Sequence, residues 1–395
     1  MLVVGGGFAG IAAAWALTRR GREVLMAWEG PGASGLYSGA LDRVEWSGPP
    51  DPRPLSADAE AFLSALGCWA PAAGVGARLA TGAGLLRPAR CRDRALLDLE
   101  PLRGRRVEVV DLGRPGWDAA ALARAWSASG WARLTRTEFR AVSVSLPEPE
   151  AVRWLSPADL AARSDDPAWV GPFASALHRA GDGESPLLIG PWLGLALESV
   201  DRVREAVRRP IGETLSEPGG AAGLRYEAAR DAWLGASGIR VERADVLSLE
   251  RRESGFDVIG TWSAQGGPTR LSGNISEVIL ALGGVVGGGI RFLSGSGPEG
   301  RTFSLSVDAP VALRLGGREV ALQSGALGAD LQRLGLSALS EVGLFVDEHQ
   351  LASAPDLYAA GDVVADRPRC AIEAIYAGIG AARAVCRVRA PSQSP

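Results

Sequence analysis

The N-terminal part of the chain is built from short apolar blocks separated by glycine and polar residues. Met1–Val4 is an apolar run, Ile11–Thr18 is an alanine-rich apolar stretch, and Val24–Trp28 is a second apolar run. The first and last blocks have the length of buried strands, and the middle one has the length of a buried helix. Gly21 stands where this helix should end. The pattern predicts a strand–helix–strand unit.

The same kinds of block recur through the rest of the chain. Arg105–Asp111 alternates in the manner of a strand, and Ser276–Gly284 is a largely apolar run that ends in glycine, as fully buried strands often do. Further helices and strands are expected over Ala57–Leu66, Ala119–Ser129, Ala221–Leu234, Gly238–Leu249, Phe256–Ser263 and Leu357–Ala360. Strands mixed with helices in this way indicate an α/β protein with a parallel sheet.

The composition changes this picture little. Of 395 residues, 47% are hydrophobic and 22% are charged, and the net charge of −3 gives no electrostatic footprint for nucleic acid. No apolar run has the length of a membrane span, and we expect no signal peptide before the first strand. The four cysteines contain no C-x-x-C pair, which disfavours an iron–sulfur or zinc site. We therefore expect a cytoplasmic protein without a metal site.

Missing residue types restrict the chemistry. The chain has no lysine, which excludes Schiff-base and pyridoxal mechanisms that depend on one. Its only histidines are His178 and His349, so a histidine-based triad is not expected. These absences indicate that a bound cofactor carries the reaction.

A glycine-rich turn follows the first predicted strand. Gly5-Gly6-Gly7-Phe8-Ala9-Gly10 has the spacing G-x-G-x-x-G. In such a turn the first glycine permits the tight bend, the second lets the backbone approach a pyrophosphate, and the third lets helix and strand pack closely. The following helix N-terminus presents N–H groups to the anion. We predict a nucleotide site here; the alternative is a glycine-rich turn in an ordinary α/β unit.

A second motif stands near the C-terminus. A strand over Leu357–Ala360 ends at Gly361-Asp362, and a helix should begin near Ala371. A carboxylate at a strand end can accept hydrogen bonds from ribityl hydroxyls. The backbone N–H groups of Ala371 and Ile372 can face the O2 edge of a flavin, where reduction places negative charge. The alternative is an aspartate that caps the following helix.

The two motifs suggest how the chain is divided. We predict a Rossmann-like FAD/NAD(P)-binding domain, a parallel sheet with helices, formed by residues 1–85 and 221–395. Residues 86–220 contain strands and helices but no glycine fingerprint. We expect them to form an inserted substrate or cap domain.

Three arginines are candidates for contact with the substrate. Arg225 begins a predicted helix after a Pro-Gly-Gly turn and could hold a phosphate by bidentate hydrogen bonds. Arg367 and Arg369 flank the presumed flavin edge. For Arg225 the alternative is an ordinary surface arginine. No catalytic residue is identified beyond these three.

These motifs carry a family resemblance. Gly5–Gly10, Val278–Gly284 and Leu357–Asp362 look like the three signatures of two-dinucleotide-binding-fold flavoproteins. The stretch from Cys370 to Ala382 is similar to the flavin-edge helix of thioredoxin-reductase-like members. Further segments resemble the B subunit of the anaerobic glycerol-3-phosphate dehydrogenases: Tyr37–Asp42, Thr137–Val142, Leu187–Leu195, Pro218 and Gly223–Arg225.

The resemblance implies FAD as cofactor, and we also expect Ser38, Gly39, Val246 and Gly283 to contact it. One position departs from the pattern. The acidic residue that binds the adenosine ribose in this superfamily falls at Trp28, and Glu29 comes one residue later. Successive strand residues point to opposite faces, so Glu29 would point away unless the strand bulges. This keeps FMN as an alternative to FAD.

The resemblance also implies an activity and partners. It implies oxidation of glycerol-3-phosphate to dihydroxyacetone phosphate in a three-subunit enzyme, with electron transfer from flavin through an iron–sulfur subunit to quinone. Through such partners the chain would lie peripherally at the inner face of the cell membrane. Two alternatives remain. One is a flavin-dependent oxidoreductase or NAD(P)H reductase for another substrate, and the other is a non-catalytic flavin-binding subunit that supports a partner dehydrogenase.

Overall fold

The computed structural model describes residues 1–42, 54–71, 76–146, 149–262, 268–270, 275–294, 301–311, 313–315, 318–320, 341–347, 352 and 354–388. The chain divides into two units, each with its own core. Unit 1 comprises Met1–Ser34, Leu55–Phe62 and Ala232–Pro395, and unit 2 comprises Gly35–Pro54 and Leu63–Asp231.

Unit 1 is built on a seven-stranded sheet with the order β14-β13-β12-β2-β1-β15-β21. Its parallel strands are β1 (Leu2–Val4), β2 (Leu25–Trp28), β12 (Arg240–Arg252), β15 (Val278–Leu280) and β21 (Leu357–Ala359). The antiparallel strands β13 (Gly255–Trp262) and β14 (Pro268–Arg270) extend one edge. The first strand lies between strands from the early and later parts of the sequence, so the N- and C-terminal motifs share one sheet.

Strands β1, β15 and β21 are buried along their whole length and β2 along most of it, whereas β12 is more exposed. Alternate residues such as Leu2 and Val278 belong to a core cluster that also contains Phe303 and Leu313 from smaller sheets. Those sheets pair β16 (Ile290–Ser294) with β17 (Arg301–Leu305), and β18 (Leu313–Leu315) with β19 (Arg318–Val320) and β20 (Gly343–Leu344).

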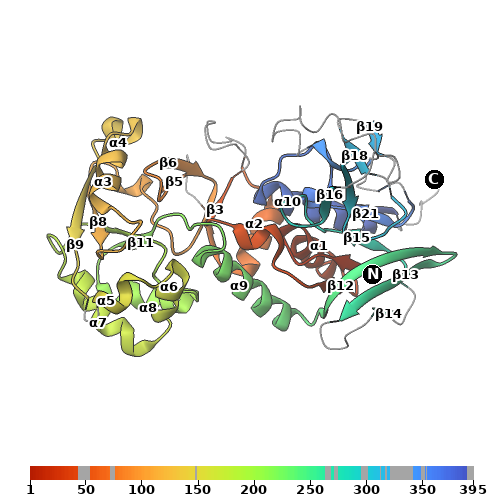
Figure 1. The fold of residues 1–395 in the computed structure, drawn as a ribbon, viewed down its shortest axis with the longest axis horizontal. Helices are drawn as coiled ribbons and strands as arrows, with labels where there is room; N and C mark the ends of the chain where they lie inside the picture. Colours follow the sequence, from red (N-terminus) through yellow and green to blue (C-terminus); the bar gives the residue numbers. More distant parts are fainter. Residues whose placement is uncertain are drawn as a thin grey trace. The chain divides into compact units, whose positions relative to one another are not determined.

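Two helices of unit 1 pack directly on each other, α1 (Phe8–Thr18) and α10 (Ala371–Val388) (Figure 1). Their contact depends on Gly378, because a β-carbon at this position would overlap the carbonyl oxygen of Ala9. Helix α2 (Ala57–Leu66) contributes Phe62, whose ring meets Trp15 edge-on at 5.7 Å between centroids. The strand–helix–strand prediction for the N-terminus is confirmed.

Unit 2 contains a separate four-stranded parallel sheet with the order β11-β10-β8-β9. Its strands are β8 (Arg106–Asp111), β9 (Glu138–Ser143), β10 (Leu187–Ile189) and β11 (Ile211–Glu213). The described α-helices with residues in this unit are the end of α2 (from Leu63), α3 (Ala119–Ser127), α4 (Gly130–Thr135), α5 (Pro149–Arg153), α6 (Pro157–Arg163), α7 (Pro167–His178), α8 (Leu197–Val207) and α9 (Ala221–Ser237), the last of which runs on into unit 1. Large buried side chains such as Trp126 and Phe173 fill the core.

Two small sheets complete the described part of unit 2. One joins β3 (Ala40–Leu41), β7 (Cys91–Asp93) and β4 (Trp69–Pro71), and the other pairs β5 (Ala77–Ala80) with β6 (Leu86–Ala89). Strands β3, β4, β5 and β6 therefore all belong to unit 2. The expected boundary at residue 85 therefore differs from the division in the structure. The flavin-binding and substrate-binding roles of the two parts stay predictions.

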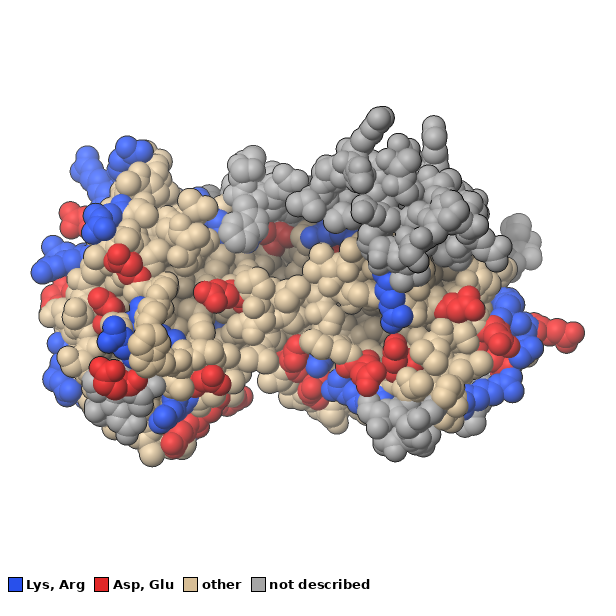
Figure 2. Space-filling model, viewed as in Figure 1, with Lys and Arg blue, Asp and Glu red and all other residues tan. Residues whose placement is uncertain are grey.

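Charged side chains of both signs are mixed over the described surface of the face shown in Figure 2, in line with a net charge near zero. None of the helices formed by the described residues combines the length and apolar character that a bilayer span requires.

The close packing of α1 on α10 can be tested with a pair of glycine substitutions. Gly378→Ala places a methyl group against the Ala9 backbone, so we expect it to lower the free energy of unfolding by about 1–3 kcal/mol. Gly235→Ala in α9 meets open space and should raise stability by about 0.5–1 kcal/mol through helix propensity. Urea denaturation of both variants measures the difference. If both variants changed the free energy of unfolding equally, α1 and α10 would have room for a methyl group between them.

Candidate functional site

The glycine turn connects β1 to the first turn of α1. Gly5 has φ of +118°, a conformation that side chains with a β-carbon rarely adopt, and a β-carbon there would also overlap the Ala281 backbone just after β15. A β-carbon at Gly10 would overlap the carbonyl oxygen of Gly5. The spacing predicted from the sequence therefore has a direct steric cause. The helix begins at Phe8, with Gly7 in an extended conformation as its N-cap.

Two side chains cover this turn. A β-carbon on Gly6 would overlap the indole ring of Trp28, so this ring lies directly on the turn. The hydroxyl oxygen of Ser34 accepts a hydrogen bond of 3.0 Å from the backbone N–H of Phe8. Ser34 therefore accepts the hydrogen bond of one of the helix N–H groups that could otherwise bind an anion. The sequence analysis missed Ser34, which no local pattern distinguishes from its glycine-rich surroundings.

Trp28 stands at the end of β2, where related folds carry an acidic ribose ligand. It is buried, and the guanidinium carbon of Arg243 lies 4.4 Å from its ring centroid. Arg243 is its partner on the neighbouring strand β12. Glu29 follows the strand and is exposed. The position that would supply an acidic ribose ligand therefore carries an aromatic ring, which lies on Gly6 and under Arg243.

The C-terminal motif lies beside the glycine turn. Strand β21 ends before Gly361, where a β-carbon would stand 2.7 Å from the β-carbon of Ala9 in the first turn of α1. Asp362 follows in a short 3-10 helix, η5 (Gly361–Val363). Two motifs at opposite ends of the sequence are therefore in contact at the carboxyl edge of one parallel sheet.

The Asp362 side chain is half-buried. Among the described residues, no hydrogen-bond donor reaches its carboxylate, and no bond links it to α10 as a cap. Burial raises the pKa of this carboxyl, and the nearby Arg369 guanidinium opposes the rise. Removing a carboxylate partly from water costs free energy unless a hydrogen-bond donor replaces the lost water. A ligand hydroxyl could be that donor.

Helix α10 begins at Ala371, close behind Asp362. Ala371 is half-buried and Ile372 is fully buried. Burial also raises the pKa of the preceding Cys370 thiol to about 11, so this thiol is neutral at physiological pH. The helix start agrees with the predicted position, and its contact with a flavin edge stays a prediction.

The three candidate arginines have different surroundings. Arg369 donates a hydrogen bond from Nη2 to the carbonyl oxygen of Val342, and its guanidinium lies where a side chain at Gly284 would stand. Arg367 is half-buried in the segment between η5 and α10. Both lie in unit 1 near Asp362 in the sequence, and only Arg369 is shown to interact with it.

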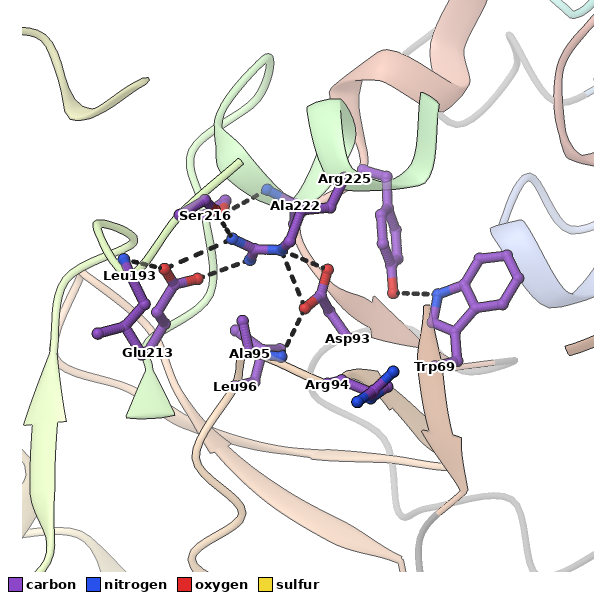
Figure 3. A network of polar contacts seen from close by, with 12 residues as sticks. Trp69, Asp93, Arg94, Ala95, Leu96, Leu193, Glu213, Ser216, Ala222 and Arg225 are labelled. Atoms are coloured by element: carbon purple, nitrogen blue, oxygen red, sulfur yellow. Dashed lines mark hydrogen bonds and ion pairs between the residues drawn. The ribbon is translucent and has the colours of Figure 1, made fainter. Parts of the chain in front are cut away.

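Arg225 lies in unit 2 and is completely buried among polar partners (Figure 3). Its Nε is 3.0 Å from Asp93 Oδ2, and its Nη2 is 2.6 Å from Glu213 Oε2. Its Nη1 donates to the carbonyl oxygen of Gly194 at 2.6 Å. All three nitrogens are engaged, so Arg225 is not a surface residue, and this geometry does not favour its predicted role as a phosphate ligand.

The same network fixes two loops. The backbone N–H of Ala95 donates to Asp93 at 2.7 Å, and that of Leu193 donates to Glu213 at 2.6 Å. One cation thus faces two carboxylates, and burial raises the pKa of Glu213 although Arg225 acts in the opposite direction. Asp93 and Glu213 are important residues that the sequence analysis did not single out.

The remaining predicted cofactor residues are not all brought together. Ser38 and Gly39 belong to unit 2, where the Ser38 carbonyl accepts a hydrogen bond from the Ser216 backbone and Gly39 packs on Leu96. Val246 is buried in the core of unit 1, and Gly283 follows β15. The predicted residues that unit 1 contains are Gly5, Gly6, Gly7, Phe8, Ala9, Gly10, Trp28, Glu29, Val246, Gly283, Gly361, Asp362, Ala371 and Ile372.

Of the two histidines, the structure describes His178. His178 Nδ1 is 2.9 Å from the carbonyl oxygen of Val207, and His349 lies outside the described residues. Within the described ranges, no three His, Cys, Asp or Glu side chains form a group that could hold a metal ion.

Comparison with known proteins supports the fold class. Residues 3–41 match the family described as NAD(P)-binding Rossmann-like domain. No curated protein matches the sequence. Similar solved structures include AlpK, with 12% identity and a TM-score of 0.33 over 96% of this chain and 59% of AlpK. They also include the GidA-related protein from Thermus thermophilus, with 12% identity, a TM-score of 0.33, and coverage of 98% of this chain and 97% of that one.

A further similar structure is iminodiacetate oxidase from Chelativorans, with 13% identity, a TM-score of 0.31, and coverage of 100% of this chain and 96% of that one. The fold class is established by the matched domain and by the parallel sheet around β1. The chain contains a Rossmann-like NAD(P)-binding domain in a mixed α/β structure. Such a domain fits a dehydrogenase or oxidoreductase.

The buried Arg225 network generates a stability prediction. Arg225→Met removes the cation and leaves two buried carboxylates uncompensated, so we expect the free energy of unfolding to fall by about 3–5 kcal/mol. Arg94→Met removes a half-exposed pair with Asp201 and should cost less than about 1 kcal/mol. Guanidinium denaturation measures both. A loss as small as that of Arg94→Met would contradict the network's structural role.

Proposed function

We propose that this chain is a flavin-dependent oxidoreductase. The observation that carries the proposal is the close approach of Gly361 to Ala9, which brings Asp362 beside the N-terminus of α1. In open α/β sheets, ligands bind at the carboxyl ends of the strands. The N-terminus of α1 can bind a phosphate, and Asp362 can accept hydrogen bonds from hydroxyls. Side by side, they suit the phosphorylated polyol chain of a flavin nucleotide.

Each part of this edge has a role in the proposal. The N–H groups at the start of α1 hold the phosphate, with Ser34 as an additional hydroxyl. Asp362 accepts a hydrogen bond from a ribityl hydroxyl, and the N-terminus of α10 faces the flavin edge. The flavin supplies hydride acceptance when bound, and the chain supplies binding, orientation and exclusion of water.

The position of Trp28 bears on which flavin is bound. FMN needs the phosphate turn and Asp362 but no ribose ligand at the end of β2. FAD needs that position, which the Trp28 ring occupies. FMN therefore fits the arrangement directly, whereas FAD requires displacement of Trp28.

For the substrate and partners, we propose a subunit-B-like component of a quinone-linked anaerobic glycerol-3-phosphate dehydrogenase. The resemblance of Tyr37–Asp42, Thr137–Val142 and Leu187–Leu195 supports this proposal. An iron–sulfur partner subunit would then accept the electrons and place the chain at the inner face of the cell membrane.

A second candidate is a flavin-binding subunit that does not itself contact the substrate. The engagement of Arg225 and His178 in structural contacts favours it. Anaerobic addition of glycerol-3-phosphate to purified flavin-loaded protein separates the two. Bleaching of the flavin absorption by the chain alone supports the dehydrogenase; bleaching only with its partner subunits supports the second candidate. A protein that binds no flavin overturns both.

The Asp362 role predicts a graded loss of flavin affinity. Losing a hydrogen bond to a charged acceptor costs about 1.5–3 kcal/mol, so Asp362→Ala should weaken FMN binding about ten- to a hundredfold. Asp362→Asn keeps an acceptor and should fall between. Asp366→Asn, at an exposed position in the same segment, is the matched control and should bind as the wild type does. Fluorescence titration of apoprotein gives the affinities, and wild-type affinity in Asp362→Ala would place the flavin elsewhere.

The Trp28 arrangement predicts a change in flavin preference. Trp28→Glu restores an acidic ribose ligand and removes the ring, so FAD affinity should rise relative to FMN by roughly tenfold. Glu29→Ala should change neither affinity, because Glu29 is exposed beyond the strand. Paired titrations with both flavins provide the ratio. A strong preference of the wild type for FAD, lost in Glu29→Ala, would show that Glu29 binds the ribose.

A further inference from the structure

Arg369 is held beside Asp362 by features that come from three other segments. Its Nη2 donates to the Val342 carbonyl just before β20. Its guanidinium occupies space that a β-carbon at Gly284 would fill, and that same β-carbon would lie 2.8 Å from the Asp362 carbonyl oxygen. The guanidinium is therefore anchored where the segments that follow β15, precede β20 and form η5 meet, rather than extended into solvent.

In this position Arg369 does not form a hydrogen bond with the Asp362 carboxylate. Within the described part of the chain, no hydrogen bond or close ion pair joins the two side chains, although each influences the ionisation of the other. The Nε of Arg369 is buried and has no hydrogen-bond partner among the described residues. A cation held near a carboxylate without bonding to it supplies charge while both carboxylate oxygens stay available.

Few other charges face Asp362 among the described residues. The elements packed on η5 are α1, α10 and β20. Helix α1 and strand β20 carry no acidic or basic side chain within their bounds. Helix α10 has Cys370 just before it and Glu373 in its first turn, whereas its own cations, Arg383 and Arg387, stand in its second half. The Cys370 thiol is neutral, and Glu373 is an acid, so Arg369 is the cation in this group that acts on Asp362.

We propose that Arg369 is a positioning residue that keeps the half-buried Asp362 ionised, so that its carboxylate can accept a hydrogen bond from a hydroxyl of a bound polyol. This inference rests on the proposed flavin site and deepens it. Burial favours the neutral acid, which has one oxygen committed to a proton and loses the strength of a charge-assisted bond. The anchored guanidinium opposes that effect without competing for the ligand. Arg369 thus acts through Asp362 and is not a substrate ligand.

The first arm of the test measures Asp362 without flavin. Carbon-detected NMR of the apoprotein, with the signal assigned by its loss in Asp362→Asn, follows the carboxyl titration. Arg369→Gln keeps a donor for the Val342 carbonyl but removes the charge, and we expect the titration midpoint to rise by about one pH unit or more. Arg369→Lys should restore much of the wild-type midpoint. Arg383→Gln, which removes a cation of α10 that is paired with Asp58, is the matched control and should leave the Asp362 midpoint unchanged.

The second arm measures FMN affinity across the same pH range. Affinity should fall as pH drops through the Asp362 midpoint, and in Arg369→Gln this fall should occur at higher pH by the same interval. An unchanged midpoint and an unchanged pH profile in Arg369→Gln would overturn the inference. If the wild type binds no flavin, the proposed function fails, and the NMR arm alone still decides whether Arg369 controls Asp362.

Discussion

Unit 1 of this protein depends on backbone segments that approach more closely than side chains allow. Gly5 and Gly10 bring the β1 turn against the end of β15 and against the start of α1, and Gly378 brings α10 onto the same helix. Because α1 is fixed from both sides, Gly361 touches its first turn and Asp362 arrives beside it. The absence of β-carbons at these glycines thus allows the segments of the candidate site to meet, and the buried apolar strands hold them in place.

Two arginines show how the surroundings of a cation decide its function. Arg225 has carboxylate or carbonyl partners for every nitrogen, so its charge is used within the fold and it ties two loops to α9. Among the described residues, Arg369 donates to one backbone carbonyl and lies near a carboxylate that it does not bind. A buried cation whose nitrogens are all hydrogen-bonded has a structural role. A cation that lies near a carboxylate without bonding to it leaves the carboxylate oxygens available for a ligand. This contrast explains why the candidate site lies with Asp362.

Much of unit 1 could be predicted from sequence because its signals are local. The strand–helix–strand start, the glycine spacing, the strand before Gly361 and the start of α10 are each visible in a short window. The pairing of residues 63–85 within unit 2 could not be predicted, since β4 finds its partner β7 only through the tertiary fold. The same applies to Arg225, whose partners Asp93 and Glu213 are distant in sequence, and to the Trp28 ring on Gly6. The local sequence shows that a residue is charged or aromatic, but it does not show which residues it contacts in the folded protein.

The proposed function requires that the glycine turn and Asp362 bind the same flavin molecule. A crystal structure of the protein grown with FMN is the sharpest test, because it locates the phosphate and the ribityl chain at once. We expect the phosphate at the N-terminus of α1, next to Phe8 and Ser34, and a ribityl hydroxyl within hydrogen-bond distance of Asp362. FMN bound elsewhere in the molecule, or bound with its phosphate away from α1 and no contact to Asp362, would contradict it.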